Sequence, residues 1–471
     1  MTSLFIRRLL GCVVLLLQSF AIIESNALAA QRYSISSSDQ AFLEDLSHRS
    51  FVYFWEQADP NTGLVLDRAR ADGSPHDETH RRIASIAATG FGLTALCIAA
   101  DRRWVEPRQA RERARSTLRF FAERAINING WFYHWMDVMT GERRWNSEFS
   151  SIDTALLLGG ILTARQFFRD DQEIVRLATK IYHRVDFQWM QNGHPALLSH
   201  GWKPESGFLK SMWDSYSEHT MLYLLAIGSP THPISQRAWW GWRRDWITYD
   251  GYSYMAGATP LFIHQYSQGW VDYRGRSERS APHVDYFENS VKATRAHRAF
   301  CIDLSKEFRS YSQDIWGISA SDSAKGYLAW GGPPRDPNID GTVVPSAAGG
   351  SLMFAPDICI AALRAMREKF GDDKRIWGKY GFIDAFNPTS GWIDTDVIGI
   401  NVGITLVSAE NLRTGKVWRW FMGNSEIPSA MRRVGLGTGR VGARVSVGAS
   451  AGPIARPEPF PGKPQNVVAV Q

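Results

Sequence analysis

The chain has 471 residues, of which 44% are hydrophobic and 21% charged, a composition typical of a globular protein that excludes a disordered, collagen-like or coiled-coil chain. Its 24 Phe, 19 Trp and 15 Tyr indicate a large core and also surfaces that stack on ring-shaped ligands. The net charge of +6 divides into +1 for residues 1–30, +2 for 31–433 and +3 for 434–471, so the body lacks the basic stripe that nucleic-acid binding needs.

Residues 1–30 have the pattern of a secretory signal peptide. Arg7 and Arg8 precede an apolar stretch over 9–23, and Ala27 and Ala29 form an A-x-A cleavage site. The pattern predicts export to the bacterial periplasm or the medium, with no membrane attachment after cleavage. A retained anchor and lipidation at Cys12 are the alternatives.

The body, 31–433, shows helical periodicity nearly throughout. Helices are predicted from 38 and at 83–101, 107–126, 150–169, 172–190, 214–228, 234–246, 260–270, 283–308, 352–369, 397–412 and 415–422. Connections near 102–106, 170–171 and 229–233 are short, whereas those at 58–82, 127–149, 191–213 and 310–350 are long. Long loops at every second junction emerge at one end of an antiparallel array, which predicts an all-α (α/α)6 toroid. Residues 434–471, rich in Gly, Ala, Val and Pro, are predicted to form a disordered tail.

The motifs of several enzyme classes are missing from the sequence. It contains no HExxH, P-loop, EF-hand loop or GxSxG, and its 12 His residues show no obvious metal-binding spacing. The long loops instead hold carboxylates among aromatic residues. Glycoside hydrolysis uses two carboxyl groups and stacking walls for sugar rings, so this reaction is the first hypothesis.

The first candidate cluster lies between 131 and 148. Asp137 follows Trp131 and Trp135, and aromatic surroundings could raise its pKa toward that of a general acid. Glu142 precedes two arginines, so a salt bridge is the alternative to a catalytic role.

The second candidate cluster contains Glu218, in the first turn of the helix predicted at 214–228. This carboxyl either complements the helix dipole or projects into the mouth of the toroid beside Trp213, Tyr216 and His219.

Three further loops supply polar groups suited to sugar hydroxyls. The candidates are Gln265, Tyr266 and Trp270 in the third cluster, Asp322 and Trp330 in the fourth, and Asp396 in the fifth. The alternative for the third cluster is a partly buried helix end, and that for the fourth is ordinary turn chemistry. In the fifth, the structural alternative is that Asp394 and Asp396 both only brace the loop.

Several stretches across about 40–425 resemble the bacterial glycoamylase-like domain proteins, which include the endo-β-1,2-glucanases of glycoside hydrolase family 144. They read FVYFWEQADPNTGLVLDR, GWFYHWMDVMTGERRWNSEFSSIDTALLLGG, MWDSYSEHTMLYLLAIGSP, PLFIHQYSQGWVDYR, DIWGISASDSAKGY and GWIDTDVIGINVGITLVSAENLRTG. The resemblance implies an α/α toroid, an inverting hydrolase, a β-1,2-glucan substrate and no metal cofactor. By position it implies Glu218 as general acid, with Asp137, Glu142 and Asp396 as acidic positions that include the base.

The expected activity is therefore hydrolysis of β-1,2-glucan to sophorose or short β-1,2-glucooligosaccharides by a monomer. A β-1,2-glucosyl transferase is an alternative, because transglycosylating relatives share the WGIS stretch. Two further alternatives are a polysaccharide lyase and a non-catalytic periplasmic glucan-binding protein. The near-neutral body disfavours the lyase, which acts on acidic sugars.

Overall fold

The computed structural model of the protein describes residues 33–374 and 376–437. The predicted signal peptide and all but the first four residues of the predicted tail lie outside this part. Contacts divide the chain into two units, Met1–Ala41 and Phe42–Gln471. In the first unit, the Ser36 hydroxyl accepts a hydrogen bond from the Asp39 N–H at 3.1 Å, at the start of helix α2. Within 33–374 and 376–437, no helix combines the length and the apolar character that crossing a bilayer requires.

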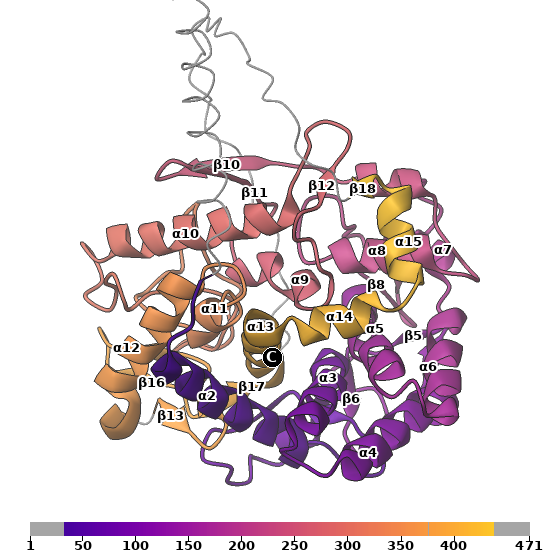
Figure 1. Ribbon diagram of the computed structural model, residues 1–471, viewed down its shortest axis with the longest axis horizontal. Helices are drawn as coiled ribbons and strands as arrows, with labels where there is room; N and C mark the ends of the chain where they lie inside the picture. The colour runs from indigo at the N-terminus through magenta and orange to yellow at the C-terminus, as the bar shows by residue number, and fades with distance from the viewer. Residues whose placement is uncertain (1–32, 375, 438–471) are drawn as a thin grey trace, which may run out of the picture. The chain divides into compact units, whose positions relative to one another are not determined.

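Two kinds of helix alternate along the second unit. Helix α3 is buried along its length from Ile86 to Ala100, and α5, α8 and α13 are nearly as buried. Helices α4 and α6, which lie between them in the chain, each bury only one side. In Figure 1, α3, α5 and α13 lie together, with α4, α6, α10 and α12 outside them. The predicted alternation of inner and outer helices agrees with this burial pattern.

Most of the helices lie within or close to the predicted ranges. The helices are α2 (Ser37–Glu56), α3 (Ile86–Arg102), α4 (Pro107–Arg119), α5 (Ser151–Phe167), α6 (Gln172–Arg184), α7 (Phe187–Met190), α8 (Thr220–Gly228), α9 (Tyr266–Trp270), α10 (Tyr286–Leu304), α11 (Pro345–Gly349), α12 (Pro356–Lys374), α13 (Gly399–Thr414), α14 (Lys416–Met422) and α15 (Glu426–Arg433). Shorter turns are η1 (His80–Arg82), η2 (Phe120–Arg124), η3 (Gln236–Trp240) and η4 (Leu261–His264).

Helices α3 and α5 touch through their backbones. A Cβ atom added to Gly160 would lie 2.0 Å from the Gly90 carbonyl oxygen, and one added to Gly90 would lie 2.3 Å from the Leu156 carbonyl oxygen. No side chain fits at either position, so the two glycines fix how closely these central helices pack.

Short antiparallel ladders join the long loops that precede the buried helices. Strands β1 (Val65–Leu66), β3 (Ile83–Ser85) and β6 (Trp135–Asp137) form one sheet, and β7 (Phe149–Ser150), β8 (Gly201–Lys203) and β9 (Gly207–Phe208) form another. Strand β2 (Arg68–Arg70) pairs with β17 (Asp396–Ile398). The loops before α3, α5, α8 and α13 are therefore held against one another. The other strands are β4 (Asn127–Ile128), β5 (Trp131–Phe132), β10 (Trp246–Tyr249), β11 (Tyr252–Met255), β12 (Ser277–Glu278), β13 (Trp377–Gly378), β14 (Gly381–Phe382), β15 (Phe386–Asn387), β16 (Trp392–Ile393) and β18 (Leu436–Gly437).

The helix predicted over 234–246 is wrong. Only the single turn η3 forms there, and the chain continues into a hairpin of β10 and β11. Asp250 and Gly251 at its tip have φ of 48° and 76°, the positive values that a type I′ hairpin turn requires. The Asp-Gly pair is a hairpin signal that the preceding apolar residues obscured.

Three other elements differ from the prediction. Helices α11 and α15 lie outside every predicted helix, because α11 is only five residues long and α15 follows the last apolar repeat. Strand β18 pairs with β12, and Val434 and Leu436 are buried. The folded body therefore continues to 437, past the predicted boundary at 433.

Candidate active site

The acidic side chains of the long loops gather in two groups. Asp322, Asp384, Asp394 and Asp396 form the first, which we call the aspartate cluster. His134, Glu148 and Asp153 form the second, which we call the His134 group. In each group several ligand-type side-chain atoms lie within 4.8 Å of one another.

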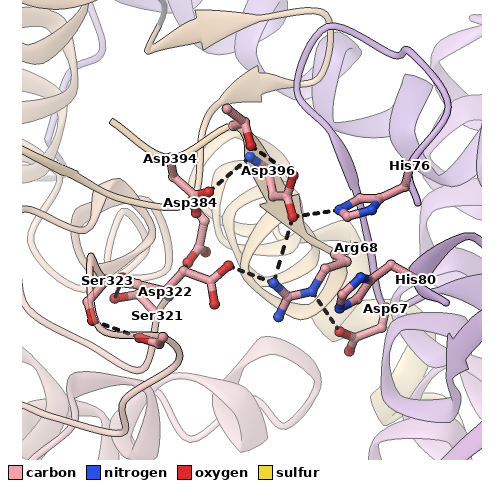
Figure 2. A network of polar contacts seen from close by, with 12 residues as sticks. Asp67, Arg68, His76, His80, Ser321, Asp322, Ser323, Asp384, Asp394 and Asp396 are labelled. Atoms are coloured by element: carbon pink, nitrogen blue, oxygen red, sulfur yellow. Dashed lines mark hydrogen bonds and ion pairs between the residues drawn. The ribbon is translucent and has the colours of Figure 1, made fainter. Parts of the chain in front are cut away.

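Arg68 is the guanidinium at the centre of the aspartate cluster. Its Nη1 lies 2.7 Å from Asp322 Oδ2 and 3.7 Å from Asp396 Oδ2, and its Nε lies 3.5 Å from Asp67 Oδ2. Figure 2 shows these aspartates on different sides of Arg68. The pairing of β2 with β17 places Arg68 opposite Ile398, so the ladder itself brings the arginine to the cluster.

Two members of the aspartate cluster bind protons unusually tightly. Burial and the neighbouring carboxylates raise the pKa of Asp384 to about 7 and that of Asp394 to about 8. Asp384 accepts hydrogen bonds from Asn401 Nδ2 at 2.7 Å and from the Asp322 N–H at 2.8 Å. Asp394 Oδ1 accepts the Asp396 N–H at 3.1 Å, whereas Asp394 Oδ2 is buried without a hydrogen-bond partner in the described residues.

Asp396 is the member of the cluster that joins it to the loop before α3. Its Oδ2 lies 2.8 Å from His76 Nε2, and its Oδ1 lies 3.6 Å from Arg70 Nη1. The side chain keeps 9% of its surface exposed. The sequence prediction that Asp396 belongs to an acidic site agrees with these contacts.

Glu218 lies in the turn before α8, two residues ahead of the helix, which begins later than predicted. Burial raises the pKa of Glu218, and the charge of Asp153 adds to the rise, although a hydrogen bond from the Ser217 hydroxyl opposes it. The backbone oxygen of Glu218 accepts a hydrogen bond from the Ser267 hydroxyl, which fixes the turn. A half-buried carboxyl whose pKa is raised is suited to the role of a general acid.

The His134 group lies beside Glu218. His134 Nδ1 is 3.1 Å from Glu148 Oε1, and His134 Nε2 is 3.4 Å from Asp153 Oδ1. Although burial opposes it, the two carboxylates raise the pKa of His134 to about 9, and the charged imidazole lowers the pKa of Glu148 to about 2. Neither Glu148 nor Asp153 was among the site residues predicted from the sequence.

The two groups border one another through Tyr266. Glu218, Asp384 and Asp153 all add to the rise that burial causes in the pKa of Tyr266. The Tyr266 hydroxyl donates to Asn401 Oδ1 at 3.4 Å, and Asn401 in turn donates to Asp384. Glu218 and the aspartate cluster therefore belong to one site.

The acid role predicted for Asp137 is wrong. Its side chain has no exposed surface and is held by Arg82 at 2.6 Å, by Arg144 and by the N–H groups of Met139 and Thr140. These donors lower the pKa of Asp137 to about 2 despite its burial, the opposite of the predicted direction. Arginines, not aromatic rings, surround the carboxylate, and Asp137 braces the turn after β6.

Glu142 lies on the exposed side of that same turn. The salt bridge considered for it is not found in the described residues, because Arg143 pairs with Glu205 and Arg144 with Asp137. Neither Glu142 nor Asp137 shares a contact with the aspartate cluster in the described residues.

Most of the predicted sugar-stacking residues are buried in this conformation, and their direct contact with a substrate stays a prediction. Rings with at most 6% of their surface exposed support the walls of the site. They are Trp131, Trp213, Tyr216, His219, Tyr266, Trp270 and Trp330, and the amide of Gln265 is equally buried and bonded to Ser351. Burial lowers the pKa of His219 to about 3, so this imidazole is neutral.

Two aromatic residues keep surface at the site. Trp135 is half-buried, and its Nε1 donates to Asp67 Oδ1 at 3.4 Å. Tyr327 is 40% exposed, and the electrostatic influence of Asp384, Asp67 and Asp322 on its hydroxyl places it beside the aspartate cluster. Sequence reasoning did not select Tyr327, although its place in a Gly- and Ser-rich loop next to Asp322 was a usable signal.

The site thus contains a half-buried carboxyl with a raised pKa, an acidic group with one arginine, and aromatic surface. This combination suits proton transfer on a neutral sugar, because the aspartates would repel an anionic one.

Comparisons with known proteins agree on one family. The Glycoamylase family model, described as "Putative glucoamylase", matches residues 210–425. A crystal structure of a Bacteroides uniformis protein with the same description is 30% identical in sequence, with a TM-score of 0.77, and the match covers 85% of this chain and 98% of that one.

Two further relatives have more specific names. An endo-β-1,2-glucanase from Chitinophaga pinensis, solved with sophorotriose and glucose, is 28% identical with a TM-score of 0.77, over 85% of this chain and 99% of that one. An exo β-1,2-glucooligosaccharide sophorohydrolase from Parabacteroides distasonis is 27% identical over 456 residues, which is 88% of this chain. The match spans 61% of the length of that curated relative.

Proposed function

Because this chain belongs to the glycoamylase family, we propose that it is a glycoside hydrolase that cleaves β-1,2-glucan. The observation that carries the proposal is Glu218, a half-buried carboxyl whose pKa is raised, in one site with the aspartate cluster. Hydrolysis of a glycosidic bond needs these two functions, an acid for the leaving oxygen and a carboxylate for water.

In the proposed mechanism, Glu218 protonates the oxygen of the scissile bond. Asp396 then accepts a proton from the attacking water, directly or through a hydroxyl of the substrate, and the anomeric carbon is inverted. Asp396 is assigned because Asp137 is fully buried between two arginines and Glu142 lies outside the cluster. Arg68 and His76 hold the Asp396 carboxylate in place.

The helical arrangement is proposed to be an (α/α)6 barrel. The alternation of buried α3, α5, α8 and α13 with one-sided helices supports it, as do the long loops that precede each buried helix. Export to the periplasm or medium is also proposed, and it rests on the sequence of residues 1–30. Mass spectrometry of the secreted protein would locate the cleavage site.

Product analysis tests the proposed function. Residues 31–471 would be incubated with linear β-1,2-glucan, with chromatography for chain length and NMR for the anomer released first. Sophorose or short oligosaccharides that appear first as the α-anomer support an inverting hydrolase. Cyclic or lengthened chains would assign a glucosyl transferase instead, and binding without any product would assign a glucan-binding protein. β-1,3- and β-1,4-glucans serve as controls for the linkage.

A further inference from the structure

A third group of metal-type ligands lies on the loop before α3. His76, Asp77 and His80 follow one another in the sequence HDETH, with the two imidazoles four positions apart. Their ligand-type atoms lie within 4.8 Å of one another, and the two rings are 4.6 Å apart between centroids. The sequence indicated no metal-binding spacing among the histidines, and this pair lies in a loop and the turn η1.

The Asp77 carboxylate is oriented toward both imidazoles. Its Oδ1 accepts the N–H groups of Thr79 at 3.0 Å and His80 at 2.9 Å, which closes a local turn. Its Oδ2 is thereby directed between the rings, 2.8 Å from His76 Nδ1 and 2.7 Å from His80 Nδ1.

The two ring nitrogens of His76 face different partners. Nε2 lies 2.8 Å from Asp396 Oδ2, while Nδ1 accepts the Asp77 N–H at 2.8 Å and lies 2.8 Å from Asp77 Oδ2. An ion bound at Nδ1 would take the place of that backbone hydrogen bond and sit beside the carboxylate. A histidine that donates one ring N–H to a carboxylate and offers the other nitrogen is the usual arrangement of a metal ligand.

From this convergence we propose that His76, Asp77 and His80 bind a divalent transition-metal ion, with Zn²⁺ the best match. Two imidazoles and one carboxylate are ligands that Zn²⁺ accepts readily, with water completing the coordination. Around a tetrahedral ion with bonds of about 2.05 Å, ligand atoms lie about 3.3 Å apart. The three atoms therefore need to separate by roughly half an ångström, which the 52% exposed Asp77 side chain allows.

The His134 group makes a useful contrast. There a single imidazole lies between two carboxylates, at 3.1 and 3.4 Å, which is the arrangement of an ion pair. The HDETH loop differs because two imidazoles converge on one carboxylate oxygen. A bound zinc ion would connect this loop to β17, because its ligand His76 contacts Asp396. The proposal of a zinc site does not depend on the identity of the substrate.

The experiment is calorimetric titration of Zn²⁺ into the metal-free full-length protein, with Co²⁺ absorption spectra as a second readout. We expect one ion per chain. Asp77→Asn and His80→Gln should each lower the affinity at least tenfold, and Asp396→Asn should lower it about 10–100-fold by removing the charged acceptor of His76. His48→Gln, which changes an exposed histidine on α2, is the matched control and should bind as the wild type does.

Circular dichroism in chelator establishes that each variant is folded before titration. No binding to the wild type, or equal binding in Asp77→Asn and His80→Gln, would overturn the proposal. Loss of binding in His134→Gln with none in His80→Gln would place the ion in the His134 group and would also overturn it.

Discussion

Asp394→Asn should make the protein less sensitive to alkaline pH. Asp394 has a folded-state pKa of about 8, above its ordinary value of 3.8, because it is buried among other carboxylates. The folded state therefore binds more protons than the unfolded state between these two values, and stability falls as the pH rises through this interval. An asparagine does not titrate, and its amide oxygen can still accept the Asp396 N–H that Asp394 accepts at 3.1 Å.

The size of the effect follows from the width of that interval. Each pH unit between the two pKa values costs 1.36 kcal/mol, so three units, from pH 5 to pH 8, remove about 4 kcal/mol of unfolding free energy through this one group. Rearrangement of the neighbouring side chains reduces this figure. We expect the stability of the variant relative to wild type to improve by about 2–4 kcal/mol between pH 5 and pH 8.

Urea denaturation at 25 °C, followed by tryptophan fluorescence at both pH values, measures this difference. Asp314→Asn changes an exposed aspartate and should give the same difference from wild type at pH 5 and at pH 8. If the stability of Asp394→Asn relative to wild type did not change with pH, Asp394 would be ionised already at pH 5, and the argument for a proton-holding cluster would fail.

Glu218→Gln should lower kcat on β-1,2-glucan by about 10²–10⁴-fold without loss of fold, whereas Glu142→Gln in the exposed turn should keep the wild-type rate. Equal rates in the two variants would remove Glu218 from the acid role. Tyr327→Ala should raise KM about fivefold, equivalent to about 1 kcal/mol of lost stacking, and Tyr327→Phe should restore most of it; an unchanged KM in Tyr327→Ala would contradict stacking. Asp137→Asn should lower the unfolding free energy by about 1–3 kcal/mol at pH 7, because two arginines lose their carboxylate. That loss should shrink as the pH falls through the folded-state pKa of about 2, and a large drop in kcat with normal stability would show that Asp137 is not structural.

The helical fold could largely be predicted from the sequence. In α6 the buried residues Ile174, Leu177, Ala178, Ile181 and Tyr182 recur at the spacing of one helix face, and this pattern depends only on local order. The two-residue ladders could not be predicted, because each joins segments distant in the chain. Asp396, for example, lies opposite Arg70.

The candidate site could be predicted only in part. Loop carboxylates pointed to segments that lie together in the structure, and Glu218, Asp322 and Asp396 came from them, with roles that stay predictions. The state of each carboxyl depends on neighbours that the sequence does not reveal, as Asp137 illustrates, since Arg82 reaches it from another loop. Aromatic residues were misread for the same reason: a tryptophan such as Trp270 suits a core as well as a sugar site.

The pairing of β2 with β17 has a consequence for protein engineering. The register sets Arg68 opposite Ile398 and Arg70 opposite Asp396, and a slip of one residue would turn every side chain of the ladder to the other face. A chimera that takes the segment before α13 from a relative, without the matching segment before α3, therefore risks a shifted register that would move Arg68 away from the aspartate cluster. These two stretches, more than 300 residues apart, should be exchanged together.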